Sequence, residues 1–323
     1  MTEVGIALPF SAIEWRELRR AGSPWQRIAR GLWFKQTIEA EVWKIRDFVH
    51  QKRIEHVVRI SGKGSILDGL TAAAIWGLPV QFNPVIELLT GIKTSRRTSI
   101  YSGYGRHDVK VVRSSRTLPE HAITFVKGFR ILNLEYLCVE LLARFPPRIS
   151  IPLVDAAAKR IVKPSLSDRA GSERSLTELK ERLFAILAER KDRRGCRRAA
   201  RAIDFISVWA DSPGESLLRL AVHQAGLPKP CEQMDVIAGG SLYFVDLGFP
   251  EHGVVFEFDG RIKYTGADAA DVVYREKLRE DAIREQYPKF IRFTWSDLQI
   301  GTIEEKLARL KYTSFIPDRV SSS

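Results

Sequence analysis

The sequence is poor in cysteine, in methionine and in long apolar runs. It holds three cysteines and two methionines in 323 residues, and Cys138, Cys196 and Cys231 lie far apart. An odd, widely spaced set argues against a disulfide framework and contains no pair with zinc-ligand spacing. No apolar run approaches the roughly 18 residues of a membrane helix, and the first residues lack the features of an export signal. We therefore expect a cytoplasmic protein with no membrane partner.

What the sequence does contain is enough apolar material for packed cores. Hydrophobic residues make up 45% of the chain and aromatic residues 10%, which excludes a disordered or fibrous protein. The length predicts two domains, or three.

Positive charge is concentrated in the first two thirds of the chain. The chain has 51 basic and 39 acidic residues, of which 14 basic and 17 acidic residues lie from Pro213 onward. The last third therefore has a net charge of −3, and the remainder has +15. The densest basic run contains one acid, Asp192, and comprises Arg190, Lys191, Arg193, Arg194, Arg197, Arg198 and Arg201. A helix would gather most of these side chains on one face. The run favours nucleic-acid contact over the alternative, a solvated face.

The front of the chain predicts a small helix-turn-helix followed by a mixed α/β region. A capping box at 11–14 begins one short helix, 25–30 begins a second, and 32–34 is a wing-like strand. Strands are expected at 57–60, 85–89, 109–113 and 123–125, and helices at 67–78 and 132–144. The polar stretch 163–175 is the expected linker, and a capping box at 175–178 predicts the helix that runs to about 190.

The last third predicts a helix, a three-stranded meander, a second helix and a fourth strand. The helices are expected at 211–225 and 268–285, and the strands at 232–237, 242–247, 254–259 and 290–295.

Three carboxylates fall on the apolar strands of this meander. Glu257 and Asp259 project from one face of their strand, and Asp246 lies on the expected antiparallel neighbour. Carboxylates on buried strands are costly unless something offsets their charge. A divalent cation would do so, and Mg²⁺ combines a few carboxylates with water and phosphate ligands.

These residues resemble a known family. The series Asp246, 257–264 (EFDGRIKY), 275–281 (REKLRED) and 291–295 (IRFTW) resembles the very-short-patch-repair-like branch of the PD-(D/E)xK nuclease superfamily. The segments 30–34 and 67–73 more weakly resemble the AbiEi-type antitoxins of abortive-infection systems.

The resemblance implies a fold and a division of the chain. It implies an α/β (α+β) protein with a winged-helix-like segment at 1–50 and an AbiEi-like α/β domain at 51–165. A basic helical linker at 166–211 leads to a restriction-endonuclease-like domain at 212–323, in which helices flank a four-stranded mixed sheet.

The resemblance also implies residue roles. Asp246 matches the metal-binding aspartate of the family and Glu257 its second acidic ligand, while Glu215 matches an acid that some members use for a metal. Asp259 stands where the family usually has its catalytic lysine, so Lys263 could replace that lysine, or Asp259 could orient the water.

Simpler roles remain open for several of these residues. Glu215 completes a capping box with Ser212, and Asp259 precedes Gly260 and could shape the turn. Arg275 and Arg279, one helical turn apart, could face phosphates or form surface ion pairs.

The resemblance predicts a Mg²⁺-dependent DNA endonuclease, with Mn²⁺ as an alternative metal, acting in phage defence or DNA repair. The alternative is a non-catalytic DNA-binding regulator or antitoxin with a degenerate nuclease fold. DNA is the expected partner, and a toxin or a second copy of the chain is a further candidate.

Overall fold

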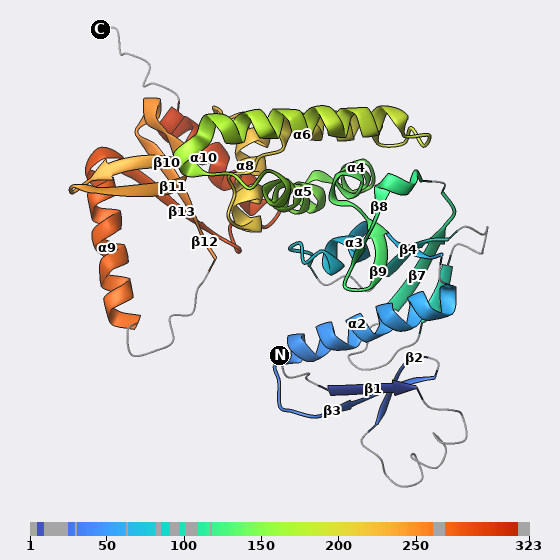
Figure 1. The fold of residues 1–323 in the computed structure, drawn as a ribbon. Helices are drawn as coiled ribbons and strands as arrows, with labels where there is room; N and C mark the ends of the chain where they lie inside the picture. The colour runs from blue at the N-terminus through green and yellow to red at the C-terminus, as the bar shows by residue number, and fades with distance from the viewer. Residues whose placement is uncertain are drawn as a thin grey trace, which may run out of the picture. The chain divides into compact units, whose positions relative to one another are not determined.

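A computed structural model describes residues 5–9, 25–29, 31–62, 64–81, 85–90, 97–100, 109–116, 118–260 and 269–315. The chain divides into two compact units, Met1–Glu140 and Leu141–Ser323. The described residues form a mixed α/β protein, as the sequence predicts, and their strands form three sheets (Figure 1). The four-part division of the chain stays a prediction.

The first unit begins with a three-stranded antiparallel sheet and a long helix. The strands β1 (Gly5–Pro9), β2 (Gln26–Ala29) and β3 (Leu32–Gln36) lie in the order β1-β3-β2, and α2 spans Val42–Ser61. The predicted strand at 32–34 is confirmed. The predicted helix at 25–30 is wrong, because 26–29 is the strand β2. The predicted helix at 11–20 lies outside the described residues.

The predicted strand at 57–60 is also wrong, because these residues belong to α2. Ile45, Val49, Arg53 and Val57 are all buried and stand four residues apart. That spacing is helical and buries one stripe of the helix. The local run Val-Val-Arg-Ile resembles a strand, whereas the four-residue spacing over the longer segment is that of a helix.

A six-stranded mixed sheet completes the first unit. Its order is β6 (Arg97–Ile100), β7 (Val109–Ser114), β5 (Val85–Leu89), β4 (Ile66–Leu67), β9 (Phe129–Leu132) and β8 (Ile123–Val126). The predicted strands at 85–89, 109–113 and 123–125 are confirmed. Helix α3 (Gly69–Ile75) follows β4, and a short helical turn covers Glu120–Ala122.

Helices lead from the first unit into the second. They are α4 (Leu134–Arg144), α5 (Pro147–Val162), α6 (Arg169–Glu189) and α7 (Cys196–Phe205), with a short turn at Leu166–Asp168. The predicted linker is wrong, because α6 already begins at Arg169. The Asp168 side chain caps α6 by accepting a hydrogen bond from the Gly171 amide at 2.9 Å. Buried side chains at Ser172, Leu176 and Leu179 extend the apolar stripe into the Ser-rich stretch.

The second unit ends in the predicted four-stranded sheet, in the order β10-β11-β12-β13. The strands are β10 (Cys231–Ala238), β11 (Ser241–Phe249), β12 (Val254–Asp259) and β13 (Lys289–Thr294). The first three form an antiparallel meander, and β13 pairs with β12 in parallel. The helices are α8 (Pro213–Gln224), α9 (Ala269–Gln286) and α10 (Thr302–Leu310), with short turns at Pro250–His252 and Lys311–Phe315.

Two apolar clusters cover the two faces of this sheet. Leu218 from α8 and Leu307 from α10 pack with Phe256 on one face. Ile283 from α9 packs with Val245 and Val255 on the other. The sheet is therefore the middle layer of three, with α9 alone on one side (Figure 1).

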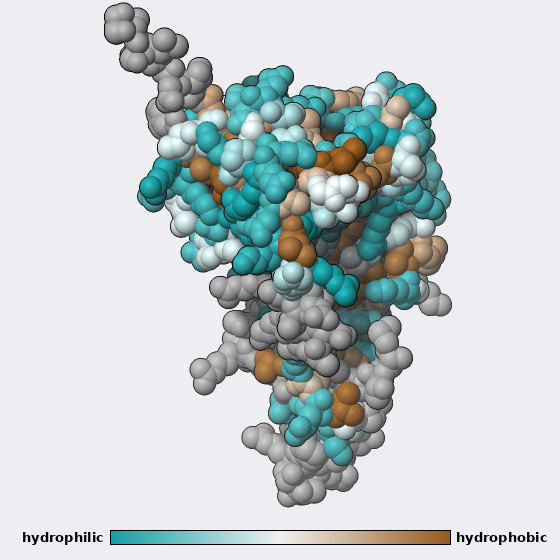
Figure 2. Space-filling model, turned by 90° about the vertical axis from the view of Figure 1, so that its left-hand side faces the viewer, coloured by the Kyte–Doolittle hydropathy of each residue, from teal (hydrophilic) through white to brown (hydrophobic). Residues whose placement is uncertain are grey.

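No helix within the described residues is long and apolar enough to cross a membrane. Figure 2 shows one face of the molecule, on which hydrophilic side chains predominate and apolar patches are separate.

Candidate functional site

Asp246 lies where the strands β11 and β12 part. Their paired register runs from Phe249 opposite Val254 to Leu247 opposite Phe256. Beyond that pair, the Asp246 carboxylate accepts a hydrogen bond from the backbone amide of Phe258 at 2.7 Å. The Asp246 side chain thus accepts the hydrogen bond that a backbone carbonyl of β11 would accept from Phe258 if the two strands stayed paired.

Glu257 lies on the face of β12 that α9 covers, as the alternation of the strand predicts. Arg279 of α9 contacts both carboxylate oxygens of Glu257, at 2.5 and 3.3 Å, and donates to the Phe244 carbonyl at 2.7 Å. The Glu257 side chain is 12% exposed and that of Arg279 27%. A two-point arginine–carboxylate pair of this kind is strong and directional. It neutralises the charge that a metal was expected to neutralise.

Further ion pairs hold α9 over the same face of the sheet. Arg292 of β13 approaches Glu276 at 3.2 Å and Glu280 at 2.9 Å, and Arg284 approaches Glu280 at 2.6 Å. Glu280 and Arg284 stand one helical turn apart on α9, so their pair lies along the helix. Arginine side chains are therefore the partners of the described acids that line this layer.

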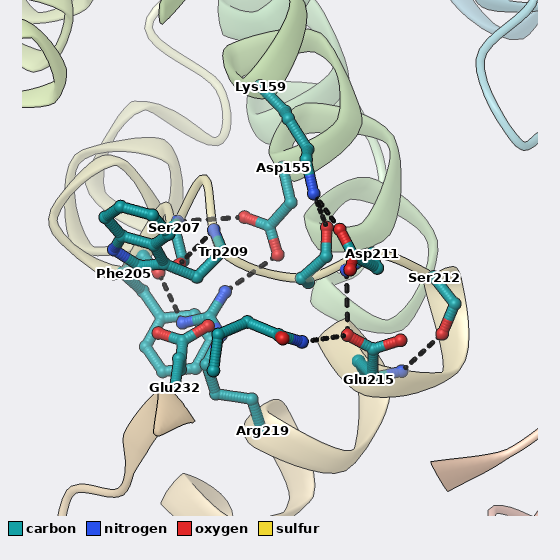
Figure 3. A network of polar contacts seen from close by, with 12 residues as sticks. Asp155, Lys159, Phe205, Ser207, Trp209, Asp211, Ser212, Glu215, Arg219 and Glu232 are labelled. Carbon is teal, nitrogen blue, oxygen red and sulfur yellow. Dashed lines mark hydrogen bonds and ion pairs between the residues drawn. The ribbon is translucent and has the colours of Figure 1, made fainter. Parts of the chain in front are cut away.

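Glu215 caps α8, as its capping-box spacing predicts. The Ser212 hydroxyl accepts from the Glu215 amide at 3.2 Å, and the Glu215 carboxylate accepts from the Asp211 amide at 2.7 Å (Figure 3). The same carboxylate accepts from Gln233 at 3.3 Å. Burial raises the pKa of Glu215, and the hydrogen bond from the Asp211 amide and a side-chain hydrogen bond with Ser212 oppose the rise. Glu215 is thus a buried capping residue close to the carboxylate of Asp246.

The carboxyl group of Asp246 has a strongly raised pKa. Burial first, and then the neighbouring Glu215 carboxylate, raise the pKa of Asp246 from 3.8 to about 7. The hydrogen bond from Phe258 and the charge of Arg279 act in the opposite direction. A carboxyl group with this pKa is partly protonated at neutral pH and can exchange a proton there.

Of the remaining predicted site residues, the structure describes Asp259, Arg275 and Arg279. Asp259 is exposed at the end of β12, and Arg275 is exposed on α9. Lys263 lies outside the described residues. Arg279, which was expected to face phosphates or to pair on the surface, turns inward to Glu257.

The donor set around Asp246 does not suit Mg²⁺ in this arrangement. Both oxygens of Glu257 face Arg279, and one carboxylate oxygen of Glu215 accepts from two amide donors. Within the part of the chain that the structure describes, no three His, Cys, Asp or Glu side chains are grouped to hold a metal ion. Mg²⁺ prefers charged carboxylates and bound water, whereas Asp246, with a pKa of about 7, is only partly ionised at neutral pH.

Sequence reasoning missed a buried ion network beside this site. Arg219 of α8 approaches Asp155 of α5 at 2.8 Å and Glu232 of β10 at 3.1 Å, and donates to the Phe205 carbonyl at 2.7 Å (Figure 3). Its guanidinium lies 4.1 Å from the centre of the Phe205 ring. Burial raises the pKa of Glu232, and the charge of Arg219 opposes that rise. Asp155 precedes Arg219 by 64 residues in the sequence, so no local pattern could reveal this pair.

The basic run forms the turn between α6 and α7 and the first half of α7, which we name the arginine turn (190–201). The Arg190 guanidinium points inward and donates to the carbonyls of Asp192 and Arg194. Arg198 donates to the carbonyls of Leu142 at 3.4 Å and Ala143 at 2.6 Å. These two arginines hold the turn in place.

The other arginines of the turn face outward. Arg193, Arg194, Arg197 and Arg201 are exposed, and the Arg194 side chain is 84% exposed. Arg194 pairs with Asp192, and its hydrogen bonds lower the pKa of Asp192 to about 2. The run is not one continuous helix, because Gly195, with φ of 75°, separates the turn from α7.

Comparisons with known proteins give distant similarities alone. No protein-family model and no curated protein matches the chain. The chain is similar to JHP933 from Helicobacter pylori, with 13% identity and a TM-score of 0.31 over 50% of this chain and 91% of that one. It is also similar to a "putative nucleotidyltransferase" from H. pylori, with 12% identity and a TM-score of 0.30 over 49% and 93%. Similarities this low carry no function over to the present chain.

The expected family is therefore wrong. Neither the nuclease nor the antitoxin resemblance is found, and the structures that the chain does resemble include one described as a nucleotidyltransferase. The endonuclease function that rested on this resemblance is corrected with it. The Mg²⁺ or Mn²⁺ cofactor stays a prediction; in the structure the charge of Glu257 is offset by Arg279.

Proposed function

We propose that the protein binds DNA through the arginine turn, by contacts with backbone phosphates. The observation that supports this proposal is the outward grouping of Arg193, Arg194, Arg197 and Arg201 around the beginning of α7.

This grouping is electrostatically unfavourable in the isolated protein. The beginning of a helix carries a partial positive charge, which favours acidic neighbours and disfavours cations. The first turn of α7 contains no acid, yet it begins at Cys196 with Arg197 and Arg198 immediately after it. Asp192 is the single acid in the run. A bound phosphate would relieve the repulsion among these cations and accept hydrogen bonds from several of them.

The backbone that carries these side chains is well supported. Arg190 closes the turn from inside, and Arg198 ties α7 to the last turn of α4. Gly195 approaches so closely that a Cβ atom there would overlap the Ala143 carbonyl. A fixed backbone lowers the ordering cost of binding, because only the outward side chains lose freedom.

Phosphate contact predicts a particular kind of binding. Release of counterions makes such binding weaken steeply with salt and depend little on base sequence. The prediction of a toxin or a second copy of the chain as partner stays open beside this proposal.

The proposal is tested by charge removal with a matched control. One variant changes the four outward arginines Arg193, Arg194, Arg197 and Arg201 to glutamine. The control changes four other exposed cations of the second unit to glutamine: Arg174, Arg182, Lys277 and Arg309. Both lose the same formal charge, so a general charge effect would weaken both equally.

Binding is measured by fluorescence anisotropy with a labelled DNA duplex at low salt. We expect the first variant to lose at least about tenfold in affinity and the control to lose much less, since exposed charges act mainly on near neighbours. Equal losses in the two variants would overturn the proposal.

A further inference from the structure

A pocket with a polar rim lies in the first unit and is separate from the arginine turn. Its volume is about 290 Å³, and it is lined by α2, α3, the segment after α3 and the turn between β8 and β9. Its polar lining comprises Arg46, Asp47, His50 and Gln51 of α2, Thr71 of α3, Gln81 and Lys127. A volume of this size is at the lower end of the range of about 300–1,000 Å³ for small-molecule sites.

The inner wall of the pocket is apolar. Ile54 of α2, Ile75 of α3 and Leu78 are buried and line it. Thr71 already uses its hydroxyl within the protein, since it donates to the Val85 carbonyl at 3.3 Å and accepts from the Glu87 amide at 2.9 Å. The wall therefore suits the hydrocarbon part of a ligand.

The charged lining of the pocket is mostly cationic. Arg46 and Lys127 contribute positive charge, and Asp47 is the one acid in the lining. The side chain of Asp47 is 56% exposed and lies 3.4 Å from Arg46. An ion pair as exposed as this is largely screened by water.

His50 lines the pocket and has a lowered pKa. Burial first, and then the charges of Arg53 and Arg46, lower the pKa of His50 from 6.5 to about 4. Arg53 is buried behind it and donates to the Ile28 carbonyl at 2.8 Å. The imidazole is consequently neutral at physiological pH, and an anion nearby would make its protonation easier.

We propose that this pocket binds a small organic monoanion with an apolar body. Arg46, Lys127 and His50 contact the charged group, and the hydrocarbon part lies on Ile54, Ile75 and Leu78. The ligand class follows from one side of the pocket being cationic and the other apolar.

The test compares two probes of the same shape on the full-length protein. One is 4-methylbenzenesulfonate, an anion over the whole pH range of the experiment, and the other is the neutral 4-methylbenzenesulfonamide. Affinity is measured by calorimetry, and the titration of His50 is followed by NMR with each probe. We expect the sulfonate to bind at least about tenfold more tightly, because the two lining cations attract it.

The His50 titration gives the sign of the coupling. The bound sulfonate should raise the pKa of His50 from about 4 toward its ordinary value of 6.5. Binding then takes up a proton, so the affinity for the sulfonate should increase as the pH falls from about 6.5 to about 4. The sulfonamide should change neither the titration of His50 nor its own affinity over this range.

A charge variant on the same helix provides the matched control. Arg46→Gln should weaken sulfonate binding about three- to tenfold, the effect of one partly exposed charge. Lys44→Gln removes an exposed charge of α2 that is paired with Glu41 and does not line the pocket, so it should have little effect. Equal affinity for the two probes, no binding of either probe, or an unchanged His50 titration would each overturn the proposal.

Discussion

Replacing Asp246 with asparagine should stabilise the second unit above neutral pH and have little effect in acid. Well below pH 4 the Asp246 carboxyl is protonated in both the folded and the unfolded protein. As the pH rises from about 4 to about 7, the unfolded chain loses this proton while the folded protein retains it, and stability falls. The loss is complete above pH 7, where asparagine avoids it.

The magnitude follows from the shift in the pKa of Asp246, from 3.8 to about 7. Each pKa unit corresponds to about 1.4 kcal/mol, so the full penalty is on the order of 4 kcal/mol. Interaction with the buried Glu215 carboxylate divides this penalty between the two groups. We therefore expect a gain of about 2–4 kcal/mol at pH 8, equivalent to a rise in Tm of roughly 4–16 °C for a unit of this size.

The assay is differential scanning calorimetry of the wild-type protein and the variant at pH 4 and pH 8. Asp235→Asn is the matched control, because Asp235 is an exposed carboxylate on the neighbouring strand β10. The asparagine oxygen at 246 can still accept the bond from the Phe258 amide. A lower Tm for Asp246→Asn at both pH values, or a change that is the same at both, would refute the electrostatic account of this site.

Three further predictions concern the second unit. Arg219→Met should destabilise it by about 3–5 kcal/mol in chemical unfolding, because Asp155 and Glu232 would remain buried without their cation; a loss below about 1 kcal/mol would show that the network contributes little. Gly195→Ala should lower the Tm and weaken DNA binding together, since φ there is 75° and a Cβ would overlap a carbonyl oxygen; unchanged melting would show that the turn tolerates rearrangement. Mg²⁺ should not raise the Tm, because Arg279 already neutralises Glu257; a rise of several degrees at millimolar Mg²⁺ would return a metal to this site.

The sequence predicted the last third of the chain well because its signals are local. Turn residues separate short apolar strands, and the order of helix, meander, helix and strand is observed between α8 and β13. One half of the predicted capping box is present, the bond from the Glu215 amide to the Ser212 hydroxyl, whereas the Glu215 carboxylate accepts from the Asp211 amide and not from that of Ser212. Alternation along β12 correctly placed Glu257 on one face, with Phe256 and Phe258 packing on the other.

The partners of the predicted carboxylates were harder to infer. Arg279 reaches Glu257 across 22 residues, and the sequence offered both a phosphate and a surface ion pair as its partner. The choice between a metal and an arginine depends on how α9 packs over the sheet, which composition and spacing do not determine. The resemblance to a nuclease favoured the metal, and the arrangement of α9 favours the arginine.

Errors in the front of the chain have a similar origin. The strand expected at 57–60 belongs to α2. The helical spacing of its buried residues Ile45, Val49 and Val57 is visible over twelve residues but not within the four residues 57–60. The serines at 163–175 favour a linker. The buried residues Leu176, Leu179 and Leu183 instead belong to one face of α6, which begins at Arg169. In both segments the longer period was the better guide.

The most direct test of the DNA-binding proposal is the salt dependence of duplex binding by the wild-type protein and the arginine-turn variant. Each phosphate contact contributes about 0.9 to the slope of log affinity against log salt concentration. If Arg193, Arg194, Arg197 and Arg201 each contact a phosphate, their replacement by glutamine should reduce the steepness of that slope by about 3–4. An unchanged slope in the variant would contradict the proposal and make the arginine turn a solvated surface.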